Sequence, residues 1–320
     1  MASPNLSEIV TTTLHNRSGT IADNTTNNNG LLRAISRNNR VRTFSGGRDI
    51  VQELSYAENS TFKYYSGYET LDVSPSDVIS AASYDIKQAA VAVTISGLEG
   101  DIQNSGPEAV TNLLESRIEN AEATMQNNLH EGIYSDGTGS GGKQITGLQN
   151  IVNSTVASTA GNIDGSTFTF WQPQLYDFST ESVTASASTI QSAMQTLTLR
   201  ATRGMDEPDL WVMGETYYQY FWESLTDIQR INTPSEGRAG FNALKHKSAD
   251  VIYDPAGSNF SATRAYALNT KYLFWRPHAN RNMVPLAERN SLTQDATVSM
   301  LVFAGNLTCS NRSLQGVMIP

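Results

Sequence analysis

The sequence predicts a mixed α+β protein, and three observations support this class. Residues 50–75 alternate between apolar and polar side chains, as a half-buried β-strand does. Residues 107–131 place their apolar side chains at helical spacing, which predicts one helix of roughly 37 Å. Residues 189–275 alternate between helical and strand-like segments, which indicates a compact α/β region. The 320 residues suffice for one large domain or two medium ones.

The composition is poor in charged residues. The chain carries 22 basic and 31 acidic residues, so its formal net charge is 22 − 31 = −9, and 17% of its residues are charged. Soluble domains normally have about 25%. One interpretation is that much of the surface faces other subunits, and the other is a secreted or virion-type polar surface. An acidic chain is not expected to coat nucleic acid by its global charge, so such contact would need a local basic patch.

Several classes of functional site are not expected. Cys309 is the single cysteine, which excludes an intrachain disulfide and a cysteine-based zinc site. The four histidines form no H-x-H or H-E-x-x-H pattern, and no G-x-S-x-G motif occurs, so no metal site, cofactor or enzymatic activity is predicted. Residues 1–10 lack a basic segment followed by an apolar run, and no stretch of about 18 apolar residues occurs. Neither a secretory signal nor a membrane span is therefore expected.

The first 50 residues are basic, unlike the rest of the chain. They contain six arginines and three acids, a net charge of 6 − 3 = +3, so the remaining residues carry −9 − 3 = −12. Residues 31–48 contain no acid and include Arg33, Arg37, Arg40 and Arg42. We predict an extended arm that pairs with acidic surface on a neighbouring chain or touches nucleic acid. A solvated basic loop is the alternative.

Residues 50–75 are expected to form a long β-hairpin, because turn-forming residues at 59–60 and 66–67 interrupt the strand-like pattern. The outer part of this hairpin consists of Phe62, Lys63, Tyr64 and Tyr65. A hairpin of this length is not stable alone, and aromatic side chains at its tip predict docking onto another chain. The alternative is that the hairpin folds back onto its own core.

A strand-rich segment at 81–98 precedes the helix at 107–131. Pro107 stands in the first turn of that helix, where proline is favoured. The face opposite the apolar stripe carries Glu115, Glu119 and Glu122. Like charges at this spacing repel one another unless a partner neutralises them. We predict that they pair with the arginine-rich segment of an adjacent subunit, and a solvated acidic face is the alternative.

The glycine-rich segment 134–143 contains the spacing of two phosphate-binding motifs. Three of its glycines match a dinucleotide fingerprint, and Lys143 nearly completes a phosphate loop. Both motifs need a strand before the loop and a helix after it. Here the long helix comes first, and Gln144 replaces the required Ser or Thr. We therefore predict no nucleotide site.

The second half of the chain predicts further helices and strands. Helices are expected at 189–202 and 215–231, and strands at 209–214, 250–254, 266–275 and 295–308. The last strand is remote in sequence from the helix at 107–131 and is expected to pack back on it.

These features, in this order, resemble a known family. Six stretches carry the resemblance, namely residues 56–62 (YAENSTF), 65–71 (YSGYETL), 112–118 (NLLESRI), 134–138 (YSDGT), 145–149 (ITGLQ) and 304–315 (AGNLTCSNRSLQ). No single stretch is diagnostic, but their collinear order resembles the tailed-bacteriophage major capsid (coat) proteins over nearly the whole chain.

The resemblance implies the Hong Kong ninety-seven-type fold with a set of named parts. These would be an N-terminal arm at 1–48, an extended β-hairpin loop at 49–77, a peripheral domain at 78–132 with a spine helix at 107–131, an axial α/β domain at 133–285, a return strand of the peripheral domain at 286–308, and a C-terminal part of the axial domain at 309–320.

The resemblance also implies a function. Copies of the chain would assemble in the host cytoplasm through hexamers and pentamers into an icosahedral virion shell around double-stranded DNA, which the inner face would contact without sequence specificity. Portal, scaffold or decoration proteins would be partners, with no membrane. Some members cross-link a lysine of the extended loop to a neighbour's asparagine, and Lys63 lies in that region, but no acceptor can be matched. An encapsulin-type shell is the alternative.

Overall fold

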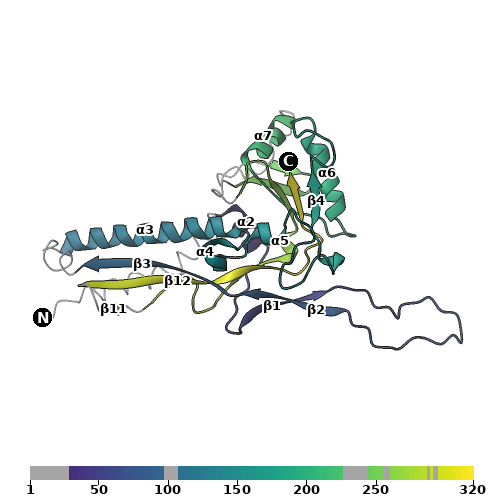
Figure 1. Ribbon diagram of the computed structural model, residues 1–320, viewed down its shortest axis with the longest axis horizontal. Coiled ribbons are helices and arrows are strands. Elements are labelled where there is room, and N and C mark those ends of the chain that lie inside the picture. The colour runs from purple at the N-terminus through teal and green to yellow at the C-terminus, as the bar shows by residue number, and fades with distance from the viewer. Residues whose placement is uncertain (1–28, 97–106, 226–243, 255–259, 287–288, 291–294) are drawn as a thin grey trace.

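The computed structural model describes residues 29–96, 107–225, 244–254, 260–286, 289–290 and 295–320. For residues 107–116, 289–290 and 297 it describes the backbone alone. The fold has an elongated part built on one long helix, a second sheet with its own helices, and a hairpin that projects beyond both (Figure 1). This arrangement is a mixed α+β fold, as the sequence predicts.

The elongated part combines α3 (Pro107–Ile133) with two long antiparallel strands, β3 (Lys87–Ser96) and β12 (Ala296–Cys309). Their register runs from Ala296↔Ser96 to Gly305↔Lys87. The strand β12 also pairs with β9 (Leu273–Pro277), β10 (Val284–Pro285) and β11 (Arg289–Asn290). The predictions of a long helix and of a late strand that returns to it are both confirmed, because β12 contacts α3.

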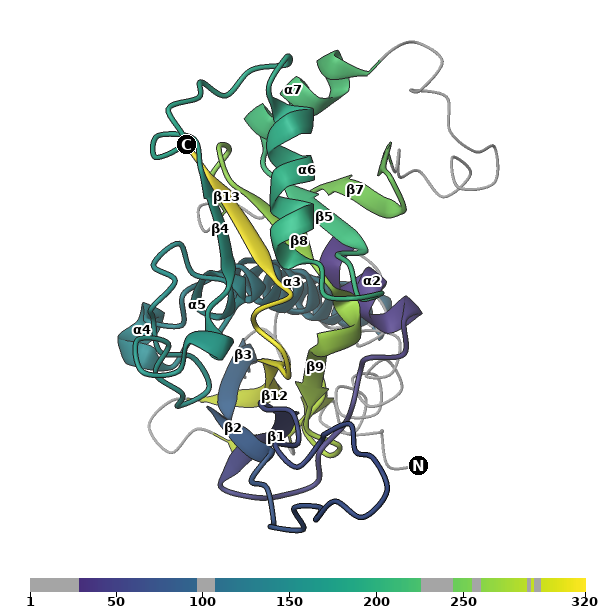
Figure 2. The ribbon, with the colours of Figure 1, turned by 90° about the vertical axis from the view of Figure 1, so that its right-hand side faces the viewer.

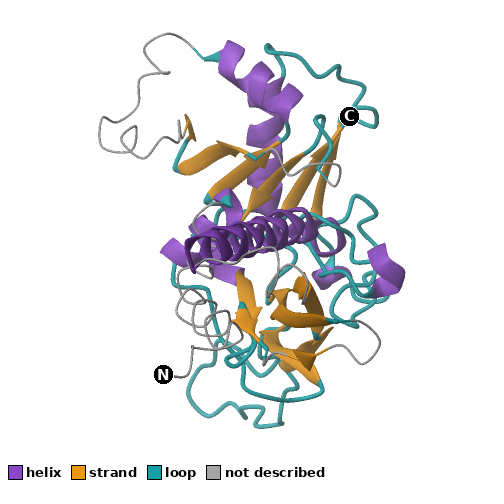
Figure 3. Cartoon of the chain, turned by 90° about the vertical axis from the view of Figure 1, so that its left-hand side faces the viewer, coloured by secondary structure: helices purple, strands orange, loops and turns teal. Residues whose placement is uncertain are grey.

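The second sheet has six strands in the order β4-β13-β8-β5-β7-β6. They are β4 (Gln174–Asp177), β5 (Leu210–Met213), β6 (Leu244–His246), β7 (Ala249–Tyr253), β8 (Ala265–Leu268) and β13 (Gly316–Ile319). The helices α6 (Ile190–Ala201) and α7 (Glu215–Ser224) pack on one face of this sheet (Figure 2). The other face contributes Leu210, Val212 and Tyr266 to a larger buried cluster, which we call the main core and which also contains Met125 and Leu129 of α3. The helix α3 therefore lies between the two sheets (Figure 3).

Two predictions for the second half need correction. The predicted strand at 266–275 is two strands, β8 and β9, which belong to different sheets. Between them, Asn269 accepts a hydrogen bond from the Lys271 N–H and caps the short 3-10 helix η5 (Thr270–Tyr272), which turns the chain. The helix predicted at 215–231 ends at Ser224, because Leu225 is extended, and residues 226–231 lie outside the described residues.

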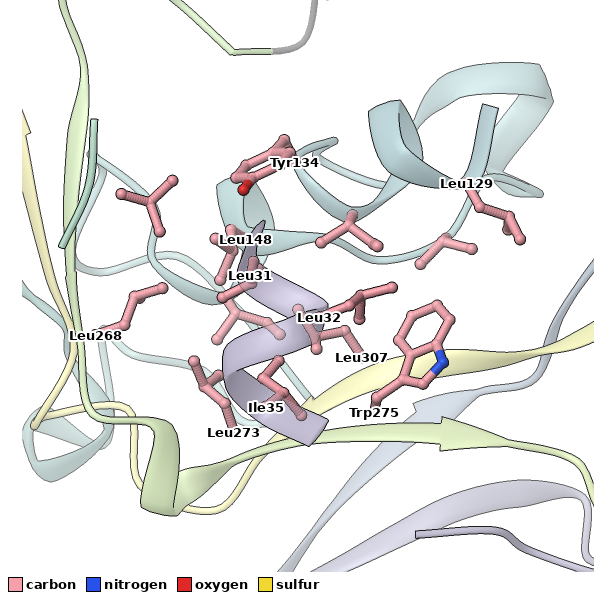
Figure 4. Packing of buried hydrophobic residues seen from close by; sticks show 14 of the residues in the cluster. Leu31, Leu32, Ile35, Leu129, Tyr134, Leu148, Leu268, Leu273, Trp275 and Leu307 are labelled. Carbon is pink, nitrogen blue, oxygen red and sulfur yellow. The ribbon is translucent and has the colours of Figure 1, made fainter. Parts of the chain in front are cut away.

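The helix α2 (Gly30–Arg37) is absent from the predictions. Asn29 caps it by accepting a hydrogen bond from the Leu32 N–H at 2.8 Å. Leu31, Leu32 and Ile35 point from one face of α2 into the main core, between α3 and β9 (Figure 4). Part of the arginine-rich segment is therefore a helix of the body with one buried face, because three apolar side chains at helical spacing suffice once a core surrounds them.

The projecting hairpin differs from its prediction as well. The strand β1 (Asp49–Ser55) pairs with β2 (Ile79–Asp85), from Asp49↔Asp85 to Ser55↔Ile79. The prediction of a return strand within 50–75 is therefore wrong, since residues 56–78 form a loop with no strand. The apolar side chains of that loop pack against no core, so nothing stabilises a pair of strands there. The strands β1 and β2, in contrast, share a small core of Ile50, Leu54, Ala82, Tyr84 and Trp171.

Short elements complete the fold. They are α4 (Gly139–Gly142), α5 (Leu148–Ile151) and the 3-10 helix η2 (Thr169–Trp171). The glycine-rich segment follows α3 directly, in the order that argued against a phosphate loop.

A buried network fixes the end of α3 to the second sheet, because the Asp254 carboxylate accepts from the Tyr134 hydroxyl and lies 2.5 Å from His130 Nε2.

His246 is half-buried at the end of β6, against aromatic rings of β5 and α7. Its ring centroid is 6.2 Å from those of Trp211 and Phe221, and its Nε2 has no hydrogen-bond partner among the described residues. Burial, with the nearby charge of Lys247, lowers the pKa of His246 below its ordinary value. The environment of this ring in the folded protein therefore favours its neutral form.

We expect acid to destabilise the protein through His246. Its pKa is lower in the folded than in the unfolded state, so its contribution to stability is complete above the ordinary histidine pKa of about 6.5 and is lost as the pH falls below it. Urea unfolding at pH 7.5 and pH 5.5 measures this loss. The variant His246→Leu should show a smaller loss between the two pH values than the wild type, and an equal loss in both would contradict the assignment.

Candidate assembly surfaces

The most exposed apolar surface of the described residues is the projecting loop, defined as residues 56–78. It extends past the rest of the molecule on the strands β1 and β2 (Figure 1). Phe62 is 74% exposed, Tyr64 91% and Tyr65 63%, and Tyr68 and Val73 are fully exposed. A monomer gains nothing by presenting so many large apolar side chains together, so this loop is a candidate contact surface.

The projecting loop has few contacts of its own. The rings of Phe62 and Tyr64 meet edge to face at 5.3 Å, and Lys63 forms an ion pair with Glu69 at 3.6 Å. Exposed pairs of this kind contribute about 0–1 kcal/mol. The four residues predicted at the tip, Phe62, Lys63, Tyr64 and Tyr65, lie together and exposed, so the alternative that this part folds back onto its own core is excluded.

The base of the projecting loop, in contrast, is firmly held. Trp171 is buried beneath β1 and β2 and donates from Nε1 to the Ala160 carbonyl at 2.9 Å. The Tyr84 hydroxyl donates to the Cys309 carbonyl at 3.2 Å, and burial raises the pKa of Tyr84, which keeps the hydroxyl protonated. Tyr56 stacks on Phe170 at 5.4 Å. The body therefore sets the direction of the loop while its tip stays free to contact something else.

The arginine-rich segment divides into two parts. Arg33 and Arg37 lie on α2, where Arg37 is 4.0 Å from Asp250. After α2 the chain runs parallel to β9, with the Arg42 N–H donating to the Trp275 carbonyl at 2.9 Å.

Beside β9, Arg40 and Arg42 lie near a third arginine. Val41 and Trp275 face the main core, so Arg40, Arg42 and Arg276 lie on the opposite face, a set that we call the arginine strip. The guanidinium carbons of Arg40 and Arg42 are 5.7 Å and 4.8 Å from the centre of the Phe274 ring. Sequence reasoning did not single out Arg276, although a charged residue in the strand-like run LFWRP was a usable signal.

The acidic face of α3 is partly described. Glu119 is exposed and Glu122 is half-buried, whereas the side chain of Glu115 lies outside the described residues. The pairing of this face with the arginines of an adjacent subunit stays a prediction. On the same helix, Arg117 instead donates from Nη1 to the Thr94 carbonyl of β3 at 2.6 Å, which ties the helix to the sheet.

A buried arginine that the sequence did not reveal holds the C-terminal segment to the helix α5 and to the loop that follows it. Arg312 is fully buried, and its guanidinium donates to the carbonyls of Asn150, Ile151 and Ser158 and to the Ser158 hydroxyl. Burial lowers the pKa of Arg312. An arginine among Ser and Asn residues gives no sign of burial in the sequence, since only the fold brings the three carbonyls around it.

The described residues form neither a metal site nor a membrane-spanning helix. Across the described residues, no group of three or more His, Cys, Asp or Glu side chains is placed to hold a metal ion. In the same part of the chain, no helix is both long and apolar enough to cross a membrane.

Comparison with known proteins reveals relatives by structure. No protein-family model and no curated protein sequence matches the chain. A chain of the cyanophage A-1(L) capsid asymmetric unit superimposes with a TM-score of 0.64 and 14% identity, over 88% of this chain and 90% of that one. The capsid of Myoviridae phage XM1 gives 0.53 and 14%, over 86% of both chains.

The satellite phage P4 procapsid, a structure that includes the size determination protein Sid, gives a TM-score of 0.51 at 10% identity, over 100% of this chain and 92% of that one. The similarity extends over most or all of each chain in all three cases. The protein therefore has the fold of phage capsid chains, which confirms the fold that the resemblance in sequence implied.

Proposed function

We propose that this protein is the major capsid protein of a tailed-phage-type particle. Copies would assemble through hexamers and pentamers into an icosahedral shell around double-stranded DNA. The observation that carries the proposal is the projecting loop, whose exposed aromatic tip stands on a firmly anchored base. Shared fold over nearly the whole chain with solved phage capsid chains supports it.

The proposal includes the parts of the subunit. We assign an N-terminal arm to 1–48, an extended loop to 49–77, a peripheral domain to 78–132, an axial domain to 133–285, a return strand to 286–308 and a C-terminal part of the axial domain to 309–320. The position of β13 inside the second sheet supports the last assignment. Within this arm, residues 30–37 form α2, and three of their side chains lie in the main core.

Partners follow from the same proposal. The chain itself is the main one, with portal, scaffold or decoration proteins and non-specific DNA as others. The P4 procapsid structure includes a size determination protein, so an external protein that acts on assembly is a reasonable class of partner here too.

Electron microscopy of the expressed protein tests the function. We expect closed shells or capsomer rings, with light scattering showing a high-mass species that depends on protein concentration. A strictly monomeric species at every protein and salt concentration would overturn the proposal. Shells that enclose a protein cargo and no nucleic acid, judged by staining and the 260/280 nm absorbance ratio, would favour the encapsulin-type alternative.

A further inference from the structure

Among the residues that the structure describes, the arginine strip has no anionic partner. Within the described part of the chain, none of Arg40, Arg42 and Arg276 forms an ion pair, whereas Arg37, Arg200, Lys245 and Lys271 each lie within 4.0 Å of a carboxylate. The strip thus concentrates three positive charges on one face of β9 and the segment beside it.

Partial burial makes this arrangement unfavourable in an isolated chain. The Nε atoms of Arg40 and Arg276 are out of contact with solvent and have no hydrogen-bond partner among the described residues. Burial, together with the charge of Arg42, lowers the pKa of Arg276. Buried N–H donors are almost always satisfied in native proteins, and water could satisfy the donors without neutralising the charge. An anionic group is the partner that would do both.

The projecting loop carries the opposite imbalance. Its acids are Glu58, Glu69, Asp72 and Asp77, and its one base is Lys63, so its net charge is 1 − 4 = −3. Lys63 is paired with Glu69. The other three acids are exposed and form no ion pair among the described residues. The loop thus carries three negative charges in excess, which equals the three positive charges of the strip.

The loop of one chain does not serve its own strip. The strands β1 and β2 direct it away from α2 and the rest of the molecule (Figure 1), and within one described chain none of its acids forms an ion pair with the strip. A contact between the two surfaces therefore joins different copies. Because the two surfaces are different patches, the contact is heterologous and repeats from copy to copy, and it closes a ring when the rotation allows.

We propose that the arginine strip is the surface on which the projecting loop of a second copy of this chain docks. The inference rests on the proposed function, since the strip would be the surface that receives the loop when subunits assemble. The loop's carboxylates neutralise the three guanidinium groups and accept from their unpaired N–H donors. The exposed tyrosines of the loop add aromatic faces over the same groups, where a guanidinium is favourably placed.

Charge reversal on both surfaces tests the proposal. One variant reverses the strip (R40E/R42E/R276E), a second reverses the loop (E58K/D72K/D77K), and a third combines all six changes. We expect either reversal alone to lower the yield of shells at least tenfold, because every interface then brings like charges together. The combined variant restores complementarity between copies and should recover most of the wild-type yield.

Two controls keep the test specific. The variant K143E/R203E/K247E makes the same change in net charge at exposed cations away from the strip and should assemble as the wild type does. Circular dichroism and thermal unfolding verify that each variant folds. Where the strip triple variant does not fold, R42E alone replaces it, because Arg42 is exposed, and should raise the concentration needed for assembly severalfold.

The outcomes separate the inference from the function on which it rests. Wild-type yields from a folded strip variant would overturn the inference and leave the capsid function intact, and so would failure of the combined variant to recover although it folds. Loss of DNA filling with normal shells would assign the strip to nucleic acid instead and would also overturn it. A wild-type chain that never assembles would overturn the proposed function itself.

Discussion

Deleting residues 59–66 is expected to leave a folded monomer and to abolish assembly into shells. The deletion removes the exposed tip with Phe62, Tyr64 and Tyr65 but spares the small core that holds β1 and β2. Largely exposed side chains contribute little to the stability of the monomer, whereas buried aromatic residues dominate the energy of protein interfaces. Size-exclusion chromatography with light scattering measures the loss of shells, and urea unfolding measures the stability of the monomer.

A milder variant distinguishes chemistry from loop length. Replacing Phe62, Tyr64 and Tyr65 by Ser keeps the length of the loop and removes its aromatic rings. We expect this variant also to fail in assembly, with a stability within about 0.5 kcal/mol of the wild type. Normal shells from either variant would show that the tip does not dock on a neighbouring subunit.

The variant Arg312→Ala is expected to lower the free energy of unfolding by about 3–5 kcal/mol. The substitution removes a fully buried guanidinium and leaves the carbonyls of Asn150, Ile151 and Ser158 without their donor. Each carbonyl left without a donor destabilises the folded state by its full desolvation free energy. The cavity left by the missing side chain destabilises the folded state further. Urea unfolding of the monomer gives the value.

Two further substitutions give this prediction a reference. Arg281→Ala removes an exposed arginine and should change the stability by less than about 0.5 kcal/mol. Arg312→Lys keeps the charge but cannot reach several acceptors in one plane, so its loss should lie between those of the other two variants. A loss below about 1 kcal/mol for Arg312→Ala would show that the three carbonyls find other partners.

Arg312 and the projecting loop are connected through the base of the loop. Arg312 holds the segment that contains Asn150 and Ser158, and the same segment leads to Ala160, which accepts from the Trp171 indole beneath β1 and β2. A partly destabilising substitution at Arg312 should therefore loosen the base of the loop as well. This connection links the stability of the body to the direction in which the loop points.

The sequence alone determined the elements that carry a long, regular pattern. The helix α3 and the strand β12 follow from apolar side chains at the spacing of their own backbone, and both extend over enough residues to show a clear period. The strand β5 follows instead from a short run of four apolar residues, which is typical of a strand buried on both faces. The sequence also predicted the exposed aromatic tip of the loop. Turn-forming residues flank Phe62, Tyr64 and Tyr65, and turns lie on the surface of a protein.

Tertiary structure decided the remainder. The helix α2 is short and rich in arginine, and only the main core around Leu31, Leu32 and Ile35 makes it stable. The break between β8 and β9 arises because the two strands belong to different sheets. A single apolar run in the sequence does not show where the chain passes from one sheet to the other. The arginine strip unites Arg40 and Arg42 with Arg276, more than 230 positions later in the chain. Hydrophobic periodicity reports what each segment buries along its own length, whereas a cluster of charges from distant segments arises only when folding sets those segments side by side.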